Sequence, residues 1–355
     1  MKPWMFLQLL FLPLVVVAGM YLGGWYNYML PMICFVIRPL LSLTVRRNAE
    51  VHDEKPGAQP ADGYRYVALF FVPVLLSLTL FALYTIATSP FDMISFTGLA
   101  ISVGIVSGII GFTLAHEFIH RFNPVDRFAG HLLLLQNNYL HYSIEHIWGH
   151  HVYACTSKDP HTARRDESFY QFLPRAVTYT FINAAQIERR RLDRKNHPFV
   201  SSRNRIILFL LLQLLVAILT IVLAGFNGFF FLLLQSIVAI GLLHMTNYLQ
   251  HYGLMRREHE GGQIEKVDAH HAWNSPGRKE GWSLFQLENH ADHHMHPSRP
   301  YEQLLKHEES PEQPTGYAGM IVLALLPPVW FRIMNKRIDS FITKTEVYET
   351  SQPIG

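Results

Sequence analysis

The sequence contains little cysteine and little charge. Cys34 and Cys155 are the two cysteines among 355 residues, which excludes a disulfide framework and a metal site built from thiolates. Charged residues make up 16% of the chain and hydrophobic residues 50%, more apolar material than a soluble domain usually carries. The formal net charge is only +3, so the composition gives no support to a nucleic-acid partner. These shortages together indicate an integral membrane protein.

Six long stretches contain at most one charged residue each. They lie at 4–22, 27–45, 66–87, 93–115, 206–224 and 228–249. Each approaches the roughly 20 residues that a helix needs to cross the hydrocarbon core. The first stretch is longer than the apolar part of a signal peptide, and the second stretch follows it almost at once. We therefore expect the first stretch to be a transmembrane helix. The pattern predicts an all-α integral membrane fold with six transmembrane helices.

Basic residues occur in alternate connections between these stretches. The connections 23–26, 88–92 and 225–227 contain no Lys or Arg, whereas 46–65 contains four and 116–205 many more. Because basic connections stay on the cytoplasmic side, we expect both termini in the cytoplasm, with a bacterial inner membrane as the simplest location.

This pattern organises the chain as a single membrane domain, 1–355. Its expected parts are the first four transmembrane helices (4–115), a cytoplasmic insertion (116–205), transmembrane helices five and six (206–249), a second cytoplasmic region (250–335) and a polar tail (336–355). Within the insertion, the basic run 187–195 is expected to form a solvated amphipathic helix facing anionic lipid. The alternative is a docking site for an acidic partner.

Nine of the 20 histidines fall into four clusters that border the apolar stretches. The clusters read HEFIH, EHIWGHH, NYLQHYG and ENHADHH. Their histidines are His116, His120, His146, His150, His151, His251, His290, His293 and His294. Spacings of three or four residues put several rings on one face of a helix, and imidazole suits transition metals. Because four ligands fill a tetrahedral site, nine histidines indicate two neighbouring metal ions.

Two helices are expected to carry ligands to the cytoplasmic membrane boundary. A helix over 93–120 would be about 42 Å long, against about 30 Å of hydrocarbon, so its last turns bring His116 and His120 out of the bilayer. The sixth span ends just before His251. The negative dipole ends of both helices favour bound cations. We therefore predict a dinuclear metal site in a cytoplasmic, histidine-rich helical cap.

HEFIH alone also matches the signature of zinc proteases, in which Glu117 would be the general base. That interpretation is disfavoured because the motif ends a predicted span and leaves the other clusters unexplained. A purely structural role, capping a helix end, is disfavoured for the same reason. We assign no side chain as a catalytic acid or base, and expect the chemistry at the metal ions.

Carboxylates near the clusters are expected to accept hydrogen bonds from the ligating rings, which fixes ring tautomer and orientation. The candidates are Glu117, Glu145, Asp159, Glu288 and Asp292. Four further histidines could be such partners or alternative ligands, namely His141, His270, His271 and His296. The others are expected to be ordinary surface or interface residues, namely His52, His131, His161, His197, His244, His259 and His307.

Three glycines, Gly104, Gly108 and Gly111, lie along one side of the fourth predicted span, just below the first histidine cluster. Close helix packing is the favoured interpretation, because small residues let helix backbones approach each other. The alternative is that they leave room for a substrate passage from the bilayer to the metal site.

The motifs around the clusters resemble those of the membrane-bound alkane monooxygenases and their xylene-methyl-oxidising relatives, within the fatty acid desaturase-like integral-membrane di-iron enzymes. The matching elements are HEFIHR, EHIWGHHVYACTSKDPHTARRDESFYQF, NYLQHYGL, HHAWNS, LFQLENHADHHMHPSRPYEQL and PTGYAG, within residues 95–332. Glu288 and Asn289 stand where the family commonly has Gln-Arg, and ACTSKDP replaces VATPEDP. These departures bear on substrate preference more than on metal binding.

The resemblance implies that the nine clustered histidines hold two non-haem iron ions. It implies O2-dependent hydroxylation of an unactivated C–H bond, expected to be terminal, in an alkane or similar lipophilic substrate within the membrane lipid. It also implies a separate cytoplasmic electron donor, either a rubredoxin or a ferredoxin with its NAD(P)H reductase. The polar tail lacks the four cysteines of a fused rubredoxin.

Three other functions stay open. A fatty-acyl desaturase or hydroxylase and a xylene-type methyl monooxygenase would use the same metal site, although NYLQHYG argues against a plain desaturase. A histidine-rich metal transporter would place ionisable groups near the bilayer midplane. The histidine clusters lie outside the apolar stretches instead.

Overall fold

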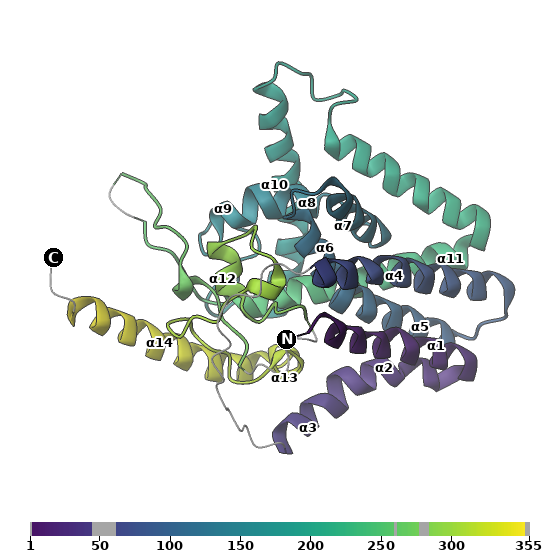
Figure 1. Ribbon diagram of the computed structural model, residues 1–355, viewed down its shortest axis with the longest axis horizontal. Coiled ribbons are helices and arrows are strands. Elements are labelled where there is room, and N and C mark those ends of the chain that lie inside the picture. Colours follow the sequence, from purple (N-terminus) through teal and green to yellow (C-terminus); the bar gives the residue numbers. More distant parts are fainter. Residues whose placement is uncertain (1, 45–61, 259–260, 277–283, 352–355) are drawn as a thin grey trace.

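The computed structural model describes residues 2–44, 62–258, 261–276 and 284–351, and these parts of the chain form helices joined by loops (Figure 1). Two isolated β-bridges, Glu258 with Ile264 and Asn274 with Glu312, are the only β-type pairing within these ranges. The predicted all-α fold is therefore confirmed for the described residues.

The first half of the chain contains the helices that lead to the first histidine cluster. They are η1 (Pro3–Leu10), α1 (Phe11–Leu22), η2 (Gly24–Tyr28), α2 (Met29–Met32), η3 (Ile33–Ile37), α3 (Arg38–Thr44), α4 (Asp62–Thr88), α5 (Met93–Val106), η4 (Ser107–Gly111), α6 (Phe112–Ile119) and α7 (Pro124–Gln136).

The rest of the chain carries the other three clusters. Its helices are α8 (Tyr142–Glu145), η5 (His146–His150), α9 (His151–Tyr153), α10 (Phe169–Asp193), α11 (Arg205–His251), η6 (Ala269–His271), α12 (His290–Met295), η7 (Tyr301–Gln303), α13 (Tyr317–Ala324) and α14 (Pro327–Ser351).

Four helical segments of the described chain are long and apolar enough to cross a membrane. They are Pro3–Leu22, Asp62–Thr88, Met93–Ile119 and Arg205–His251. The last contains two helices, because Gly225 has the non-helical angles φ 68° and ψ −173°, and Figure 1 shows the two halves of α11 turning back on each other at this point. The two halves correspond to the predicted spans 206–224 and 228–249.

The second predicted span, 27–45, is built differently from the others. The chain from Gly24 to Thr44 is a run of short helical elements, η2, α2, η3 and α3, which follow one another without a loop. Most basic residues of the predicted 46–65 connection lie outside the described residues, as does His52.

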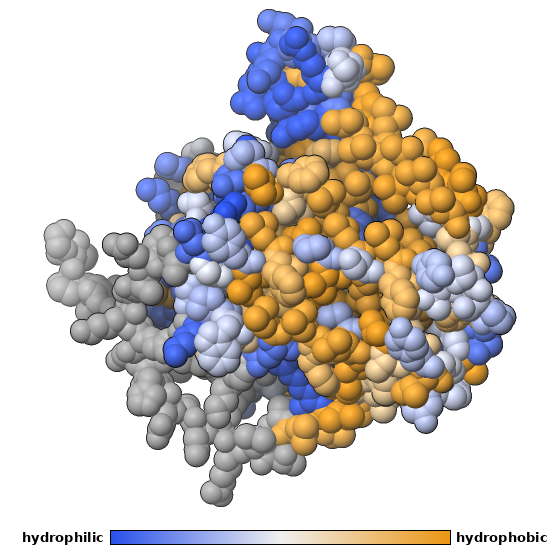
Figure 2. Space-filling model, turned by 45° about the vertical axis from the view of Figure 1, so that its right-hand side comes forward, coloured by the Kyte–Doolittle hydropathy of each residue, from blue (hydrophilic) through white to orange (hydrophobic). Residues whose placement is uncertain are grey.

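Apolar side chains cover the outer surface of the long helices. Figure 2 shows a continuous hydrophobic band beside a hydrophilic region at the top of the molecule. Exposed leucines of α11 belong to this apolar surface, including Leu208, Leu211, Leu215 and Leu219. Exposed apolar surface of this extent suits contact with lipid tails and would be unfavourable in water.

The glycines of the third long segment are sites of close helix packing. A Cβ on Gly104 would lie 2.7 Å from the Gln235 carbonyl oxygen, and one on Gly108 would lie 2.8 Å from the Leu242 side chain. Both neighbours belong to the second half of α11, so small residues allow this helix to approach. Gly111 has only ordinary contacts, at 3.8 Å.

The basic run expected at 187–195 begins in the last turns of α10, which ends at Asp193. Within it, the buried carboxylate of Glu188 lies 2.6 Å from the Arg191 guanidinium and 2.7 Å from that of Arg205. Burial alone would raise the pKa of Glu188, but hydrogen bonds from the two arginines outweigh it and lower the pKa to about 2. This ion pair joins α10 to the start of α11.

Replacing this carboxylate is expected to destabilise the fold. Glu188→Gln keeps the shape but removes the charge, so we expect a loss of about 1–3 kcal/mol and a lower melting temperature in detergent, followed by tryptophan fluorescence. The folded-state pKa is depressed, so this contribution is present at neutral pH and disappears as the pH falls from the unfolded-state value through about 2. The exposed pair of Arg189 and Asp193 is the control, and Arg189→Ala should leave the melting temperature unchanged.

Candidate metal centre

The nine clustered histidines come from the ends of several helices. His116 lies in the last turn of α6 and His120 directly follows that helix, while His251 is the last residue of α11. The other two clusters lie on η5 with α9 and on the short helix α12. Figure 1 shows α9 and α12 beside the ends of these long helices. The chain leaves α11 sharply, because Gly253 has φ 70°.

The structure divides the nine histidines into two groups. In the first group the candidate ligand atoms all lie within 4.8 Å of one another, and its members are His116, His120, His146, His151 and His293. The second group meets the same distance limit, and its members are His150, His251, His290 and His294. We call them the five-histidine group and the four-histidine group.

Two helical segments supply ligands to both groups. Along η5, which is a π-helix, hydrogen bonding from i to i+5 brings residues five apart over one another. The Nε2 atoms of His146 and His151 accordingly lie 3.0 Å apart, and His150 joins the other group. On α12, His293 joins the five-histidine group and His294 the four-histidine group. The rings of His151 and His294 have centroids 4.7 Å apart, so the two groups adjoin.

The distances between nitrogens fit coordination of a cation better than hydrogen bonding. The Nε2 atom of His146 lies 3.0 Å from the Nε2 atoms of both His120 and His151, and one nitrogen cannot make a hydrogen bond to two such partners. Two ligand nitrogens that bind one metal ion at a right angle, each about 2.1 Å from it, would be about 3.0 Å apart. The buried Nε2 atoms of His116 and His150 have no hydrogen-bond partner among the described residues.

Burial favours the neutral form of five of the nine rings, and a metal ligand must be neutral. Burial, reinforced by neighbouring histidines, lowers the pKa of His120 to about 3. The same causes hold the pKa of four other cluster histidines well below the usual range, and these are His146, His151, His293 and His294. A neutral ring keeps a lone pair for a metal ion at pH 7. An all-imidazole set suits iron, zinc, copper or nickel.

The rings of His150 and His251 each have a partner at Nδ1, on the side of the ring that faces away from the histidine groups. Asp159 Oδ2 lies 2.9 Å from Nδ1 of His150, and Thr162 also donates to this carboxylate oxygen. Nδ1 of His251 lies 3.2 Å from the backbone carbonyl oxygen of His271. Asp159 and His271 were both candidates for such contacts. His271 makes its contact through the backbone, while its side chain faces Asp268.

The other candidate carboxylates have different partners. Glu117 binds the Arg121 guanidinium, at 2.5 Å, and accepts from the backbone N–H of Tyr301. Glu145 lies 2.7 Å from Nε2 of His161, which is not one of the nine. Asp292 contacts Arg299, His307 and His296. His270 contacts Asp268. Glu288 is buried, and its backbone carbonyl accepts a hydrogen bond from the backbone N–H of Ser275.

The expectation that His161 and His244 are ordinary surface or interface residues is wrong. Both are fully buried, and their rings stack with centroids 5.2 Å apart. His161 bridges Glu145 and Asn247, and His244 Nε2 lies 2.7 Å from the Tyr139 hydroxyl. His244 lies seven residues before His251 on the same helix, so helical spacing was a signal that could have placed it on the cluster face.

The other histidines outside the clusters have varied surroundings. His141 is buried against the Tyr139 ring, and His307 contacts Asp292. His131 lies against the Arg127 carbonyl and His197 against Arg203. His259 lies outside the described residues.

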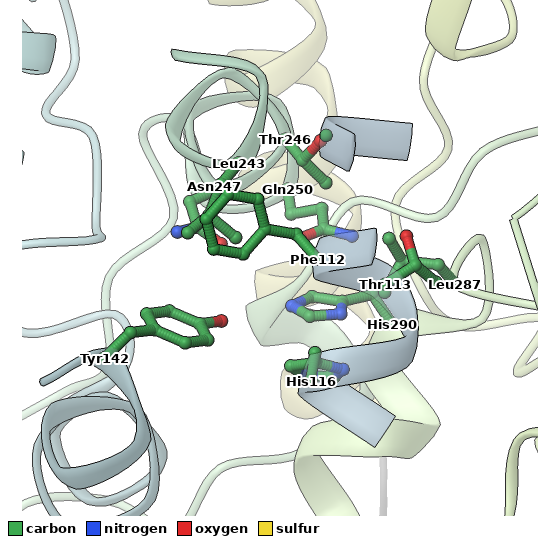
Figure 3. A pocket seen from close by; sticks show the side chains of 11 residues that line it. Phe112, Thr113, His116, Tyr142, Leu243, Thr246, Asn247, Gln250, Leu287 and His290 are labelled. Atoms are coloured by element: carbon green, nitrogen blue, oxygen red, sulfur yellow. The ribbon is translucent and has the colours of Figure 1, made fainter. Parts of the chain in front are cut away.

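A cavity reaches the two histidine groups from the long helices (Figure 3). His116 of the five-histidine group and His290 of the four-histidine group both line it. Its walls include the apolar side chains of Phe112, Leu243 and Leu287, and Gly108 lies at its edge. The Tyr142 hydroxyl points into the same space in Figure 3. Of the three glycines considered for a substrate passage, Gly108 lines this cavity.

Comparison with known proteins places this site in a family. Residues 93–324 match the family model of the fatty acid desaturases. Alkane 1-monooxygenase 2 of Pseudomonas aeruginosa is 35% identical over 94% of this chain and 92% of its own length. Alkane 1-monooxygenase 2 of Alcanivorax borkumensis is 36% identical over 90% of this chain and 83% of its own, and the xylene/toluene monooxygenase hydroxylase component of Pseudomonas putida is 26% identical over 90% and 84%.

These matches define the chain as an integral membrane oxidoreductase of the desaturase-like class. Within that class, the chain belongs to the alkane 1-monooxygenase family.

The division into groups predicts how metal is lost on mutation. His251→Ala leaves three histidines in the four-histidine group, so we expect metal content to fall from two ions per chain to one, measured by mass spectrometry of the purified protein. His131→Ala, outside both groups, should keep full metal content. Loss of both ions, or of neither, in His251→Ala would contradict the division.

A second prediction concerns the carboxylate behind His150. Asp159→Asn weakens the acceptor that orients this ring, and we expect metal affinity to fall roughly 10–100-fold in chelator competition. Asp193→Asn, at an exposed carboxylate of α10, is the control and should bind metal as the unmodified protein does. Unchanged affinity in Asp159→Asn would show that the ring is positioned by other contacts.

Proposed function

We propose that the protein is a non-haem di-iron monooxygenase that hydroxylates an unactivated C–H bond, preferably a terminal one, of an alkane or similar lipophilic substrate. One observation carries the proposal: nine imidazoles form two adjoining groups where two long apolar helices end, and a partly apolar cavity touches both groups. The alkane 1-monooxygenase relatives support this substrate class.

Iron bound by the nine histidines would supply the redox chemistry that O2 activation requires and that zinc lacks. The nine imidazoles would leave coordination positions unfilled on two six-coordinate ions. The overall reaction is RH + O2 + 2e⁻ + 2H⁺ → ROH + H2O, in which one oxygen atom enters the C–H bond and the other leaves as water.

The protein's own side chains prepare the site for this reaction. Phe112, Leu243 and Leu287 give the cavity apolar walls that can hold the end of an alkyl chain beside His116 and His290. Asp159 fixes the His150 ring, so the ligand lone pair points to the metal side. No side chain needs to act as an acid or base on the C–H bond itself.

We further propose that six helices cross the membrane, with both termini and the histidine groups on the cytoplasmic side. The alternation of basic and uncharged connections supports this orientation. The break in α11 at Gly225 and the continuous helical run from Gly24 to Thr44 supply the two spans beyond the four long segments. The histidine groups then lie at the membrane boundary, directly accessible to a substrate dissolved in lipid.

The alternative substrates are an acyl chain and an aromatic methyl group. The xylene/toluene monooxygenase relative supports an aromatic methyl group as an alternative substrate. Its sequence identity to this chain is lower than that of the alkane 1-monooxygenases. Metal transport fits poorly, because the histidine groups lie where the apolar helices end and all nine rings converge on two fixed positions.

Product analysis tests the proposal. The full chain in nanodiscs, loaded with iron and supplied with electrons and O2, is expected to convert octane to 1-octanol, detected by gas chromatography with mass spectrometry. Xylene and fatty-acyl substrates are run in parallel, and His116→Ala serves as the inactive control. Olefins as the only products, or full activity with zinc in place of iron, would overturn the proposal.

A further inference from the structure

The proposed reaction consumes two electrons per turnover, and these must cross the protein to reach the histidine groups. Seven of the nine histidines are buried, and His120 and His151 are the two that are partly exposed. Because electron transfer slows steeply with distance, a donor protein gains most by docking where a ligand reaches the surface. Both partly exposed histidines belong to the five-histidine group.

An exposed aromatic side chain lies on the segment that carries His146, His150 and His151. The indole of Trp148 is 58% exposed, although Trp148 lies on η5 between the ligands His146 and His150. Val152, four residues further on and next to His151, is 47% exposed. Trp148 on η5 and Val152 on α9 thus present an exposed apolar surface on the segment that carries His146, His150 and His151.

Basic side chains border this apolar surface. The Arg256 guanidinium donates to the Val152 carbonyl at 3.1 Å, and its neighbour Met255 is 53% exposed. The Lys158 ammonium lies 5.9 Å from the centre of the Tyr153 ring, one residue beyond Val152. We define the Trp148 surface as the five residues Trp148, Val152, Met255, Lys158 and Arg256.

We propose that the Trp148 surface is the docking site of a small acidic iron–sulfur electron carrier, and that electrons enter the five-histidine group through His151. The inference rests on the proposed monooxygenase function. An exposed aromatic anchor within a charged rim is the usual composition of a protein-binding hot spot, and the positive rim selects a negatively charged partner. Each docking event would pass one electron from the carrier's iron to iron held by the five-histidine group, so two events would supply one turnover.

The other exposed ligand, His120, has a different setting. Phe122 is 86% exposed, and Val125 and Phe128 at the start of α7 are exposed as well. Phe122 in the loop before α7, together with Val125 and Phe128 on α7, directly follows a membrane-length segment, and these three apolar side chains suit insertion into the lipid interface. In Figure 1, α9 lies away from the far ends of the long helices.

The test compares two exposed aromatic residues, each two positions from a ligand. Trp148→Ala and Phe122→Ala are prepared as full chains in nanodiscs with iron bound. Reduction of the metal centre is followed by stopped-flow absorbance, once with a reduced rubredoxin or [2Fe–2S] ferredoxin and once with dithionite. We expect Trp148→Ala to slow reduction by the carrier at least about tenfold and to leave reduction by dithionite unchanged.

Two further variants separate the contribution of the Trp148 ring from that of the basic side chains. Trp148→Phe should recover part of the rate, and Lys158→Glu should weaken carrier binding and reduce its salt dependence. Wild-type carrier-driven rates in both Trp148→Ala and Lys158→Glu would overturn the proposal, as would equal slowing in Phe122→Ala. It is also overturned if neither carrier reduces the unmodified protein.

A single turnover of the dithionite-reduced, unmodified protein with octane keeps the two proposals apart. If it forms no alcohol, the hydroxylase function fails, while the docking measurements stand on their own. If it forms alcohol but Trp148→Ala accepts electrons normally from the carrier, only the docking proposal fails.

Discussion

The arrangement of this site depends on the close packing of neutral imidazole nitrogens in the two histidine groups. Protonated rings at these distances would repel one another. Neutral rings that are buried without a partner leave their nitrogens without a hydrogen bond. Several pairs of Nε2 atoms nevertheless lie 3.0–3.2 Å apart, including those of His290 with His294 and of His251 with His290. A cation shared by each group would resolve both problems. Metal binding and folding of this region are therefore expected to be coupled.

The fold brings these rings together by ending its long helices at one place. Small residues at Gly104 and Gly108 let the third long segment pack closely on the second half of α11, so His116 and His251 come to the same end of the bundle. The same packing leaves the cavity that touches both histidine groups. The same apolar helices thus carry the membrane-facing surface, position the two histidine groups and line the cavity between them.

The sequence was sufficient to predict the all-α fold, most of the long helices and the set of nine histidines, because hydropathy and histidine spacing are local signals. Their division into five and four was not predictable, since it depends on the π-helical turn from His146 to His150. Which carboxylate contacts a ligand also depends on side-chain direction: Asp159 reaches His150, whereas Glu145, directly beside His146, turns to His161. Burial of His161 and His244 follows from tertiary packing, which spacing alone does not describe.

The central proposal is that imidazole rings are the only protein ligands of two iron ions. X-ray absorption at the iron edge, combined with iron quantification on the purified full chain, tests it most directly. The account predicts two irons per chain, each surrounded by nitrogen or oxygen neighbours with the outer-shell scattering of imidazole and without a sulfur ligand. One iron per chain, or a sulfur neighbour contributed by Cys155, would contradict it.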